Sequence, residues 1–232
     1  MTTSKQTHND LSITLRVLAR LLQYPDADNR AHLQEMRAAL HGARAIGRQR
    51  LAELDALIDS QLAQSPIDAE ADYVQLFDCG RTTSLHLFEH VHGDSRDRGP
   101  AMIDLAKTYE AAGLFLAEGE LPDYLPVVLE YASTQPPAQA RAFLSEVAHI
   151  LNAIFNTLEK RESRYASVLG ALLEVAGETA RAVAITPDEP LDMAWAEPAA
   201  FDGCSTQGQA KPGDPQPVRI VRRTNPAQGA ST

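Results

Sequence analysis

The segment HLFEHVHGDSRDRG, from His86 to Gly99, gathers three of the seven histidines with acidic and basic side chains. Within it, His86, Glu89 and His90 match the H-x-x-E-H pattern of some zinc peptidases. Two histidines four residues apart share one face of a helix and can coordinate zinc, while a neighbouring glutamate can act as a general base. The pattern therefore raises a zinc-dependent hydrolase as one hypothesis.

A structural role for these histidines is nevertheless favoured. The sequence offers no distal glutamate on a strong helix as a third ligand, and Gly93 is expected to end the helix at once. Histidines in a last helical turn interact favourably with the helix dipole and with free carbonyl groups. The following Asp94, Arg96 and Arg98 are typical of a polar loop held by ion pairs. No phosphate-binding loop or nucleophile elbow occurs elsewhere, so we expect no catalytic residue and no metal ligand.

The elements that position this segment are predicted to be helices. Apolar residues recur with a helical period along nearly the whole body, and no sustained period of two is found. The pattern predicts helices over about 11–22, 28–43, 51–62, 65–78, 84–92, 99–113, 122–133, 143–158 and 165–176. Since every amphipathic stripe needs another helix to cover it, we predict an all-α fold, a single-domain bundle of about eight to nine helices.

The composition changes after Thr186. Residues 186–232 are rich in proline and glycine and poor in apolar side chains, so they are predicted to form a flexible tail after a helical domain over 1–185. Trp195, the single tryptophan, lies in this tail with Phe201 nearby. The tail could pack back on the body or act as a docking motif, and a signalling or regulatory module that works through Trp195 is a further hypothesis.

Bulk properties favour a cytoplasmic protein. The formal net charge is −10, which argues against a nucleic-acid partner. No apolar run approaches the ~20 residues of a membrane span, and the polar first residues predict no signal peptide, so no stable membrane association is expected. Cys79 and Cys204 lie far apart and are not predicted to form a disulfide.

Two segments carry a resemblance to a known family. The first is DYVQLFDCGRTTSLHLFEHVHGDSRDRGPAMIDLAKTYEAAGL, from Asp72 to Leu114, and the second is LPDYLPVVLEYAS, from Leu121 to Ser133. Together they resemble the NarJ-type assembly chaperones of respiratory nitrate reductase, within the wider TorD/DmsD redox-enzyme maturation family. Tyr124 stands where that wider family has a histidine, which argues against carrying over a nucleotide-related role proposed for it.

The resemblance implies an all-helical cytoplasmic protein that acts as a private chaperone, one that serves a single client protein, and not as an enzyme. It implies binding to an immature form of the catalytic (alpha) subunit of membrane-bound nitrate reductase, especially its N-terminal segment, until the molybdenum cofactor is inserted and before membrane docking. Proteins that deliver the molybdenum cofactor are further candidate partners. The metal and the cofactor would belong to the client, so none is expected in this chain.

A client segment would most simply lie as a helix in an apolar groove with a polar rim. The candidate groove residues come from the two matched segments, and core packing is the competing interpretation for each: Tyr73, Phe77, Leu85, Phe88, Met102, Tyr109, Tyr124, Leu125 and Leu129. The candidate rim residues are Glu89, His90, His92, Asp94, Arg96, Arg98, Asp123 and Glu130, with the arginines as alternative braces of the loop. Histidines could also make the grip on the client depend on pH near 6.5.

Overall fold

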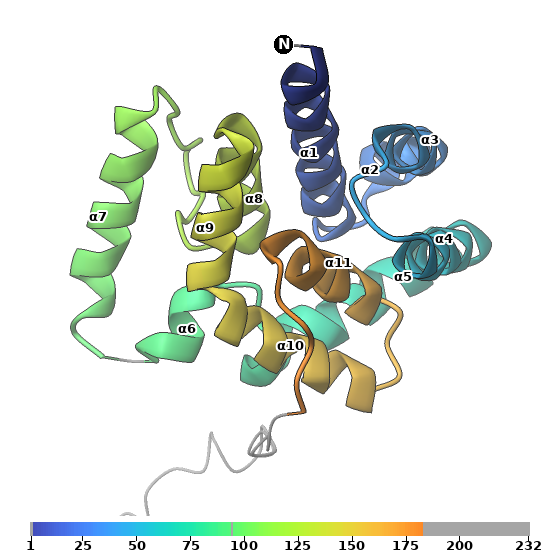
Figure 1. Ribbon diagram of the computed structural model, residues 1–232. Helices are drawn as coiled ribbons and strands as arrows, with labels where there is room; N and C mark the ends of the chain where they lie inside the picture. Colours follow the sequence, from blue (N-terminus) through green and yellow to red (C-terminus); the bar gives the residue numbers. More distant parts are fainter. Residues whose placement is uncertain (1, 94, 183–232) are drawn as a thin grey trace, which may run out of the picture. The chain divides into compact units, whose positions relative to one another are not determined.

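The computed structural model describes residues 2–93 and 95–182, in which the chain forms eleven α-helices, a π-helical turn and a 3-10 turn (Figure 1). The α-helices are α1 (Thr2–Leu21), α2 (Ala27–Ala31), α3 (Leu33–Ala43), α4 (Arg48–Ala63), α5 (Pro66–Tyr73), α6 (Leu87–Val91), α7 (Arg98–Ala111), α8 (Leu125–Thr134), α9 (Pro137–Glu146), α10 (Ala148–Lys160) and α11 (Ala166–Ala176). The π turn spans Val74–Asp78 and the 3-10 turn Arg81–Thr83. The predicted all-α fold is confirmed for this part of the chain. Asp94 and the predicted tail with Trp195 lie outside the described residues.

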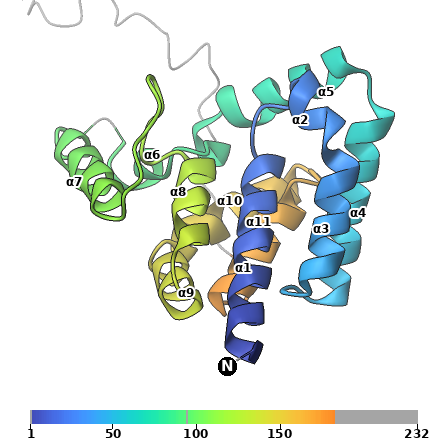
Figure 2. The same ribbon diagram turned by 90° about the horizontal axis from the view of Figure 1, so that it is seen from above.

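Two helices form the centre of the bundle. α1 packs chiefly against α8 and α3, and α11 packs against α10, α9 and α4. Figures 1 and 2 show α3 and α4 on one side of α1 and α8 and α9 on the other. The predicted stripe of α1 is buried in the core, with Leu15, Leu18 and Leu22 inaccessible to solvent. Burial of such apolar side chains is the main driving force for the fold.

The predicted start signals at Ser65 and Pro66 and the predicted stop at Gly93 are confirmed. Ser65 caps α5 through its side-chain oxygen, which accepts the Asp68 N–H at 3.2 Å, and Pro66 occupies the first helical position. Gly93 and Gly113 adopt positive φ after α6 and α7. These positions therefore use the left-handed backbone conformation that glycine tolerates best.

Several predicted helix bounds are wrong, and the bundle has more helices than expected. The segment 28–43 is broken at His32, and the segment 143–158 is broken at Val147, because both residues leave the helical region at ψ near 0°. The helix expected over 84–92 covers only Leu87–Val91, and the helix expected from Pro122 begins at Leu125. The breaks at His32 and Val147 each divide one predicted helical segment between two helices.

α7 lies at the edge of the bundle, on the far side of α8 from α3 and α4 in both views (Figures 1 and 2). Tyr109 is its buried residue, while Ile103 is 58% exposed. The segment that follows α7, residues 112–124, returns the chain to α8. In residues 2–93 and 95–182, no helix combines the length and the apolar character that crossing a membrane requires.

Candidate functional site

The two segments that carried the sequence resemblance meet at the start of α8. His86 and Tyr124 form an isolated antiparallel bridge. On either side of it, the Leu125 N–H donates to the Leu85 carbonyl at 2.8 Å, and the Leu87 N–H donates to the Asp123 carbonyl at 3.0 Å. This pairing holds the stretch before α6 against the stretch before α8, two parts of the chain that are separated by all of α7.

Asp123 is the polar centre of this junction and is 0% exposed. Its carboxylate accepts the Phe88 N–H at 3.1 Å and faces His86 Nδ1 at 3.4 Å and Arg98 Nη2 at 3.8 Å. The hydrogen bond to Asp123 raises the pKa of His86, and burial of the ring opposes that shift. Arg98 also pairs with Glu89 at 3.5 Å. Asp123 therefore serves groups of its own chain and lies beneath the surface instead of on a rim.

The histidines do not adopt the arrangement that the zinc hypothesis required. His86 precedes α6 in an extended conformation, so it does not share a helix face with His90. His90 Nε2 lies 2.9 Å from the Ser84 carbonyl, and the His92 ring contacts Phe88 with centroids 5.5 Å apart. Among the residues that the structure describes, no three His, Cys, Asp or Glu side chains are grouped as metal ligands would be.

The tyrosines around the junction have internal hydrogen-bond partners. The Tyr109 hydroxyl donates to the Pro122 carbonyl at 2.8 Å, and the Tyr73 hydroxyl donates to the Leu22 carbonyl at 2.7 Å. The hydroxyl of Tyr124 lies 3.2 Å from that of Tyr73. Burial is the main cause that raises the pKa of all three tyrosines, so they stay protonated at neutral pH.

The candidate residues named from sequence do not gather on one surface. Seven are buried, namely Tyr73, Phe77, Leu85, Tyr109, Asp123, Leu125 and Leu129. Seven are half-buried, namely Phe88, Glu89, His90, His92, Arg98, Met102 and Tyr124, while Arg96 and Glu130 are exposed. Tyr109 and Glu130 line one pocket, and Tyr73, Phe77, Leu85 and Tyr124 line another. Leu125 and Leu129 belong to the hydrophobic core.

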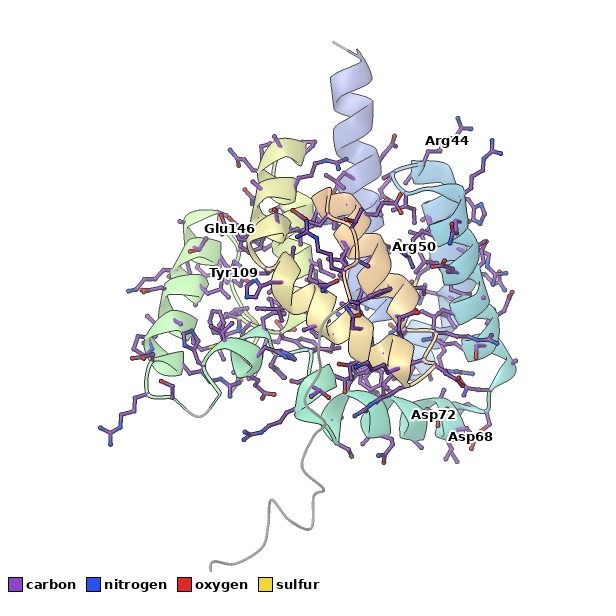
Figure 3. All side chains as sticks on the ribbon, turned by 60° about the horizontal axis from the view of Figure 1, so that its bottom comes forward. Arg44, Arg50, Asp68, Asp72, Tyr109 and Glu146 are labelled. Carbon is purple, nitrogen blue, oxygen red and sulfur yellow. The ribbon has the colours of Figure 1, made fainter. Side chains whose placement is uncertain are left out.

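The first pocket, which we call the seam pocket, has a volume of about 390 Å³ and lies where α1, α8 and the segment after α7 meet. Its lining consists of Arg16, Arg20, Tyr109, Leu114, Phe115, Leu116, Glu120, Val127, Glu130, Tyr131 and Thr134. Tyr109 comes from the side of α7 that faces α8 and α9 (Figure 3), and its ring packs on Tyr131 at 4.8 Å. Apolar side chains make up much of the lining, and charged residues of both signs flank it.

Phe115 is the prominent residue of the seam pocket. It is 81% exposed, although burial of a large aromatic side chain would stabilise the folded protein. Our sequence reasoning missed it and its neighbours Leu114 and Leu116, because they follow the helix stop at Gly113 and belong to no amphipathic stripe. Three successive large apolar residues in an otherwise polar connection are a signal that could have identified them.

The second pocket, which we call the tyrosine pocket, has a volume of about 260 Å³. It is lined by Tyr24, Tyr73, Phe77, Asp78, Leu85, His86 and Tyr124. These side chains come from the connection between α1 and α2, the junction of α5 with the π turn, and the paired stretches before α6 and α8. Four of the seven were named from sequence as groove residues and His86 was named in the zinc hypothesis, whereas Tyr24 and Asp78 were not named.

Comparison with known proteins gives a consistent family assignment. The family described as "Nitrate reductase delta subunit" matches residues 23–169. The chain is 45% identical over 164 residues to the nitrate reductase molybdenum cofactor assembly chaperone NarJ of Escherichia coli strain K12, covering 71% of this chain and 70% of that protein. It is 34% identical over 165 residues to a probable chaperone of the same name from Bacillus subtilis strain 168, covering 71% and 88%. A redox enzyme maturation protein of Archaeoglobus fulgidus shares the fold, with a TM-score of 0.51 at 20% identity over 72% of this chain and 94% of that one.

Proposed function

The chain belongs to the nitrate reductase delta subunit family, that of the NarJ-type assembly chaperones, and from that premise we propose that it is a cytoplasmic chaperone of nitrate reductase. In this proposal it binds the immature catalytic subunit of the membrane-bound enzyme through that subunit's N-terminal segment. It holds the subunit until the molybdenum cofactor is inserted and releases it for docking on the membrane. Its role is to bind, and the cofactor chemistry belongs to the client.

The seam pocket is the observation that carries this proposal. Phe115, Leu114 and Leu116 offer apolar surface beside a hollow that the bundle does not fill with its own side chains. An amphipathic helix recognises a partner by placing apolar side chains, spaced three or four residues apart, into such a hollow. We therefore assign the client's N-terminal segment to the seam pocket, as a helix beside α8.

The charges around the seam pocket can orient that helix. Arg16 and Arg20 line the pocket from α1, whereas Glu130 lines it from α8 and Glu120 from the segment before α8. A client helix with acidic residues toward α1 and basic residues toward Glu130 would meet complementary charge on both sides. Rim charges of this kind affect orientation and association rate more than affinity, so the apolar anchors should dominate the binding energy.

The other candidate residues named from sequence then have a supporting role. The network of Asp123, His86 and Arg98 fixes the stretch before α8, and the bond from Tyr109 to Pro122 fixes the end of α7 relative to that stretch. Both contacts hold the two ends of the connection that carries Phe115. We propose that these residues shape the seam pocket without all of them contacting the client.

The test is calorimetric titration of the full chain with a peptide of the first twenty residues of the nitrate reductase catalytic subunit from the same organism. Phe115→Asp should weaken binding by about 30-fold or more, because loss of a central aromatic anchor costs ~2 kcal/mol or more. Ile67→Asp is the matched control, since Ile67 is 77% exposed on α5 and lines none of the described pockets.

The two variants remove equally exposed apolar side chains, so neither is expected to unfold the protein. Equal affinity of Phe115→Asp and Ile67→Asp would contradict the seam pocket as the client site. Failure of the unmodified chain to bind either the peptide or the whole catalytic subunit would overturn the proposed function itself.

A further inference from the structure

The tyrosine pocket is built largely from aromatic rings of separate elements. Tyr73 packs against Phe77 at 4.9 Å and against Tyr24 at 5.6 Å, measured between ring centroids. Tyr73 and Phe77 are 4% exposed and form the floor, while Tyr24 is 42% exposed and lies at the mouth. Tyr124 completes the wall, and its ring lies 5.3 Å from that of His86.

A carboxylate stands beside these rings. Asp78 lines the pocket and is exposed at the end of the π turn. Within the described part of the chain, none of the ion pairs involves Asp78. Burial is the largest cause that raises the pKa of Tyr24, Tyr73 and Tyr124, and the negative charge of Asp78 contributes to the shift of all three. Asp78 therefore lies near enough to these three rings to act on them.

The histidine that lines the pocket already has a carboxylate partner. His86 lines the wall, and its ring faces the Asp123 carboxylate at 3.4 Å. Glu89 and Arg98 are the other charged groups that act on His86, and these two are paired with each other. Among the seven lining residues, His86 therefore has a counter-charge in Asp123, whereas Asp78 is in none of the described ion pairs.

Aromatic faces beside a carboxylate form a binding site for a cation. Ring faces carry negative electrostatic potential and attract ammonium and guanidinium groups, and a nearby carboxylate adds direct attraction. We propose that the tyrosine pocket binds one arginine or lysine side chain of the client segment, which rests on the proposed function and gives it a second contact point. A volume of about 260 Å³ suits one side-chain head group, because pockets for drug-sized ligands measure ~300–1,000 Å³.

Both pockets lie beside α1 and α8. Their separation along α8 predicts the spacing between the two anchor residues of the client helix. Tyr124 precedes α8 and lines the tyrosine pocket, whereas Val127 and Tyr131 of α8 line the seam pocket. The seven residue steps from Tyr124 to Tyr131 correspond to a rise of ~10 Å at 1.5 Å per residue of α-helix. A client helix lying beside α8 would therefore carry its basic anchor about two turns from the apolar residue that contacts Phe115.

A small-molecule titration tests the pocket without the client. N-acetylarginine amide, added at millimolar concentration, should shift the NMR resonances of Tyr24, Asp78 and Tyr124, while the neutral isostere N-acetylcitrulline amide should not. Asp78→Asn should weaken the arginine response about two- to fivefold, as expected for loss of one exposed charge. Asp104→Asn removes the same charge from an exposed site on α7 and should leave the response unchanged. Equal responses to arginine and citrulline, or equal effects of the two variants, would overturn the proposal.

The client peptide gives a second, independent test. Replacing each arginine of the peptide by citrulline, or each lysine by acetyl-lysine, should identify one position whose change weakens binding to the wild type but has little further effect in Asp78→Asn. If no position behaves so while Phe115→Asp still weakens binding, the tyrosine pocket is not the anchor and the proposed function stands. If neither the unmodified peptide nor the whole catalytic subunit binds, the proposed function fails, and the acetylarginine titration alone decides the chemistry of the pocket.

Discussion

Asp123→Ala should destabilise the protein more than any exposed charge substitution. The Asp123 carboxylate is inaccessible to solvent and joins the stretch before α6 to the stretch before α8. Its removal leaves the Phe88 N–H, which donates to it at 3.1 Å, without its acceptor. His86 and Arg98 lose their shared counter-charge at the same time.

The size of the effect follows from these contacts. A buried N–H without an acceptor costs ~1–3 kcal/mol. The side chains of His86 and Arg98 are 32% and 28% exposed, so water can replace part of what they lose, and we assign that loss only about 1 kcal/mol. We therefore expect the free energy of unfolding to fall by about 2–4 kcal/mol in Asp123→Ala. Asp123→Asn should cost less, because an amide oxygen can still accept the Phe88 N–H.

Urea unfolding at neutral pH, followed by far-ultraviolet circular dichroism, measures the free energy of unfolding of each variant. The m-value should be the same for wild type and variants, so that a shift of the midpoint reports stability. Asp104→Ala is the control, because the Asp104 side chain is 79% exposed and its loss should cost less than ~0.5 kcal/mol. If Asp123→Ala and Asp104→Ala lowered the free energy of unfolding equally, the buried network would not be what fixes this junction.

Three further predictions concern single contacts and use the same unfolding assay. Tyr109→Phe should lower the free energy of unfolding by ~1 kcal/mol, since the Pro122 carbonyl loses its donor, and an unchanged value would refute this. Ser65→Ala should cost ~1 kcal/mol through loss of the α5 cap, whereas Ser65→Gly should cost only a few tenths, and the reverse order would contradict the cap. The pKa of His86 is raised in the folded state, so its bond to Asp123 stabilises the protein most below the unfolded value near 6.5 and this contribution is lost as pH rises through the folded value. The stability difference between wild type and His86→Gln should accordingly be larger at about pH 5.5 than at about pH 8.5, and a constant difference would argue against it.

The fold could be predicted from the sequence because helix formation here depends on local signals. The stripe of α1 and the cap at Ser65 each follow from residues within a few positions of one another. The helix expected over 84–92 failed for the opposite reason. The Ser84 hydroxyl accepts the N–H of His86 at 3.2 Å, and His86 then pairs with Tyr124. That second contact spans 38 positions and leaves no periodic trace in either segment.

The candidate site could be predicted only in part, because an apolar stripe does not reveal what covers it. Leu125 and Leu129 lie in a matched segment, and both are in the core. Tyr109 and Glu130 come from the same reasoning and line the seam pocket. A helical period places a residue on a face, whereas the neighbouring helices decide whether that face meets the core or a hollow.

Phe115 shows the complementary failure. A residue in an irregular connection has no period to analyse, so nothing in the local sequence predicts that Phe115 is 81% exposed. The resemblance supplied the family from long matched segments, but it supplied no contact geometry. The structure was therefore needed to find the hollow beside α8.

Site-specific photocrosslinking tests most directly the claim that the seam pocket holds the client's N-terminal segment. A benzoylphenylalanine placed at position 115 is irradiated in the complex with the catalytic subunit of nitrate reductase, and the crosslinked peptide is identified by mass spectrometry. The same group placed at position 67, on the exposed part of α5, is the control. The account predicts a crosslink from position 115 to the first twenty or so residues of the subunit and none from position 67. Equal crosslinking from both positions, or crosslinks from position 115 only to other parts of the subunit, would contradict it.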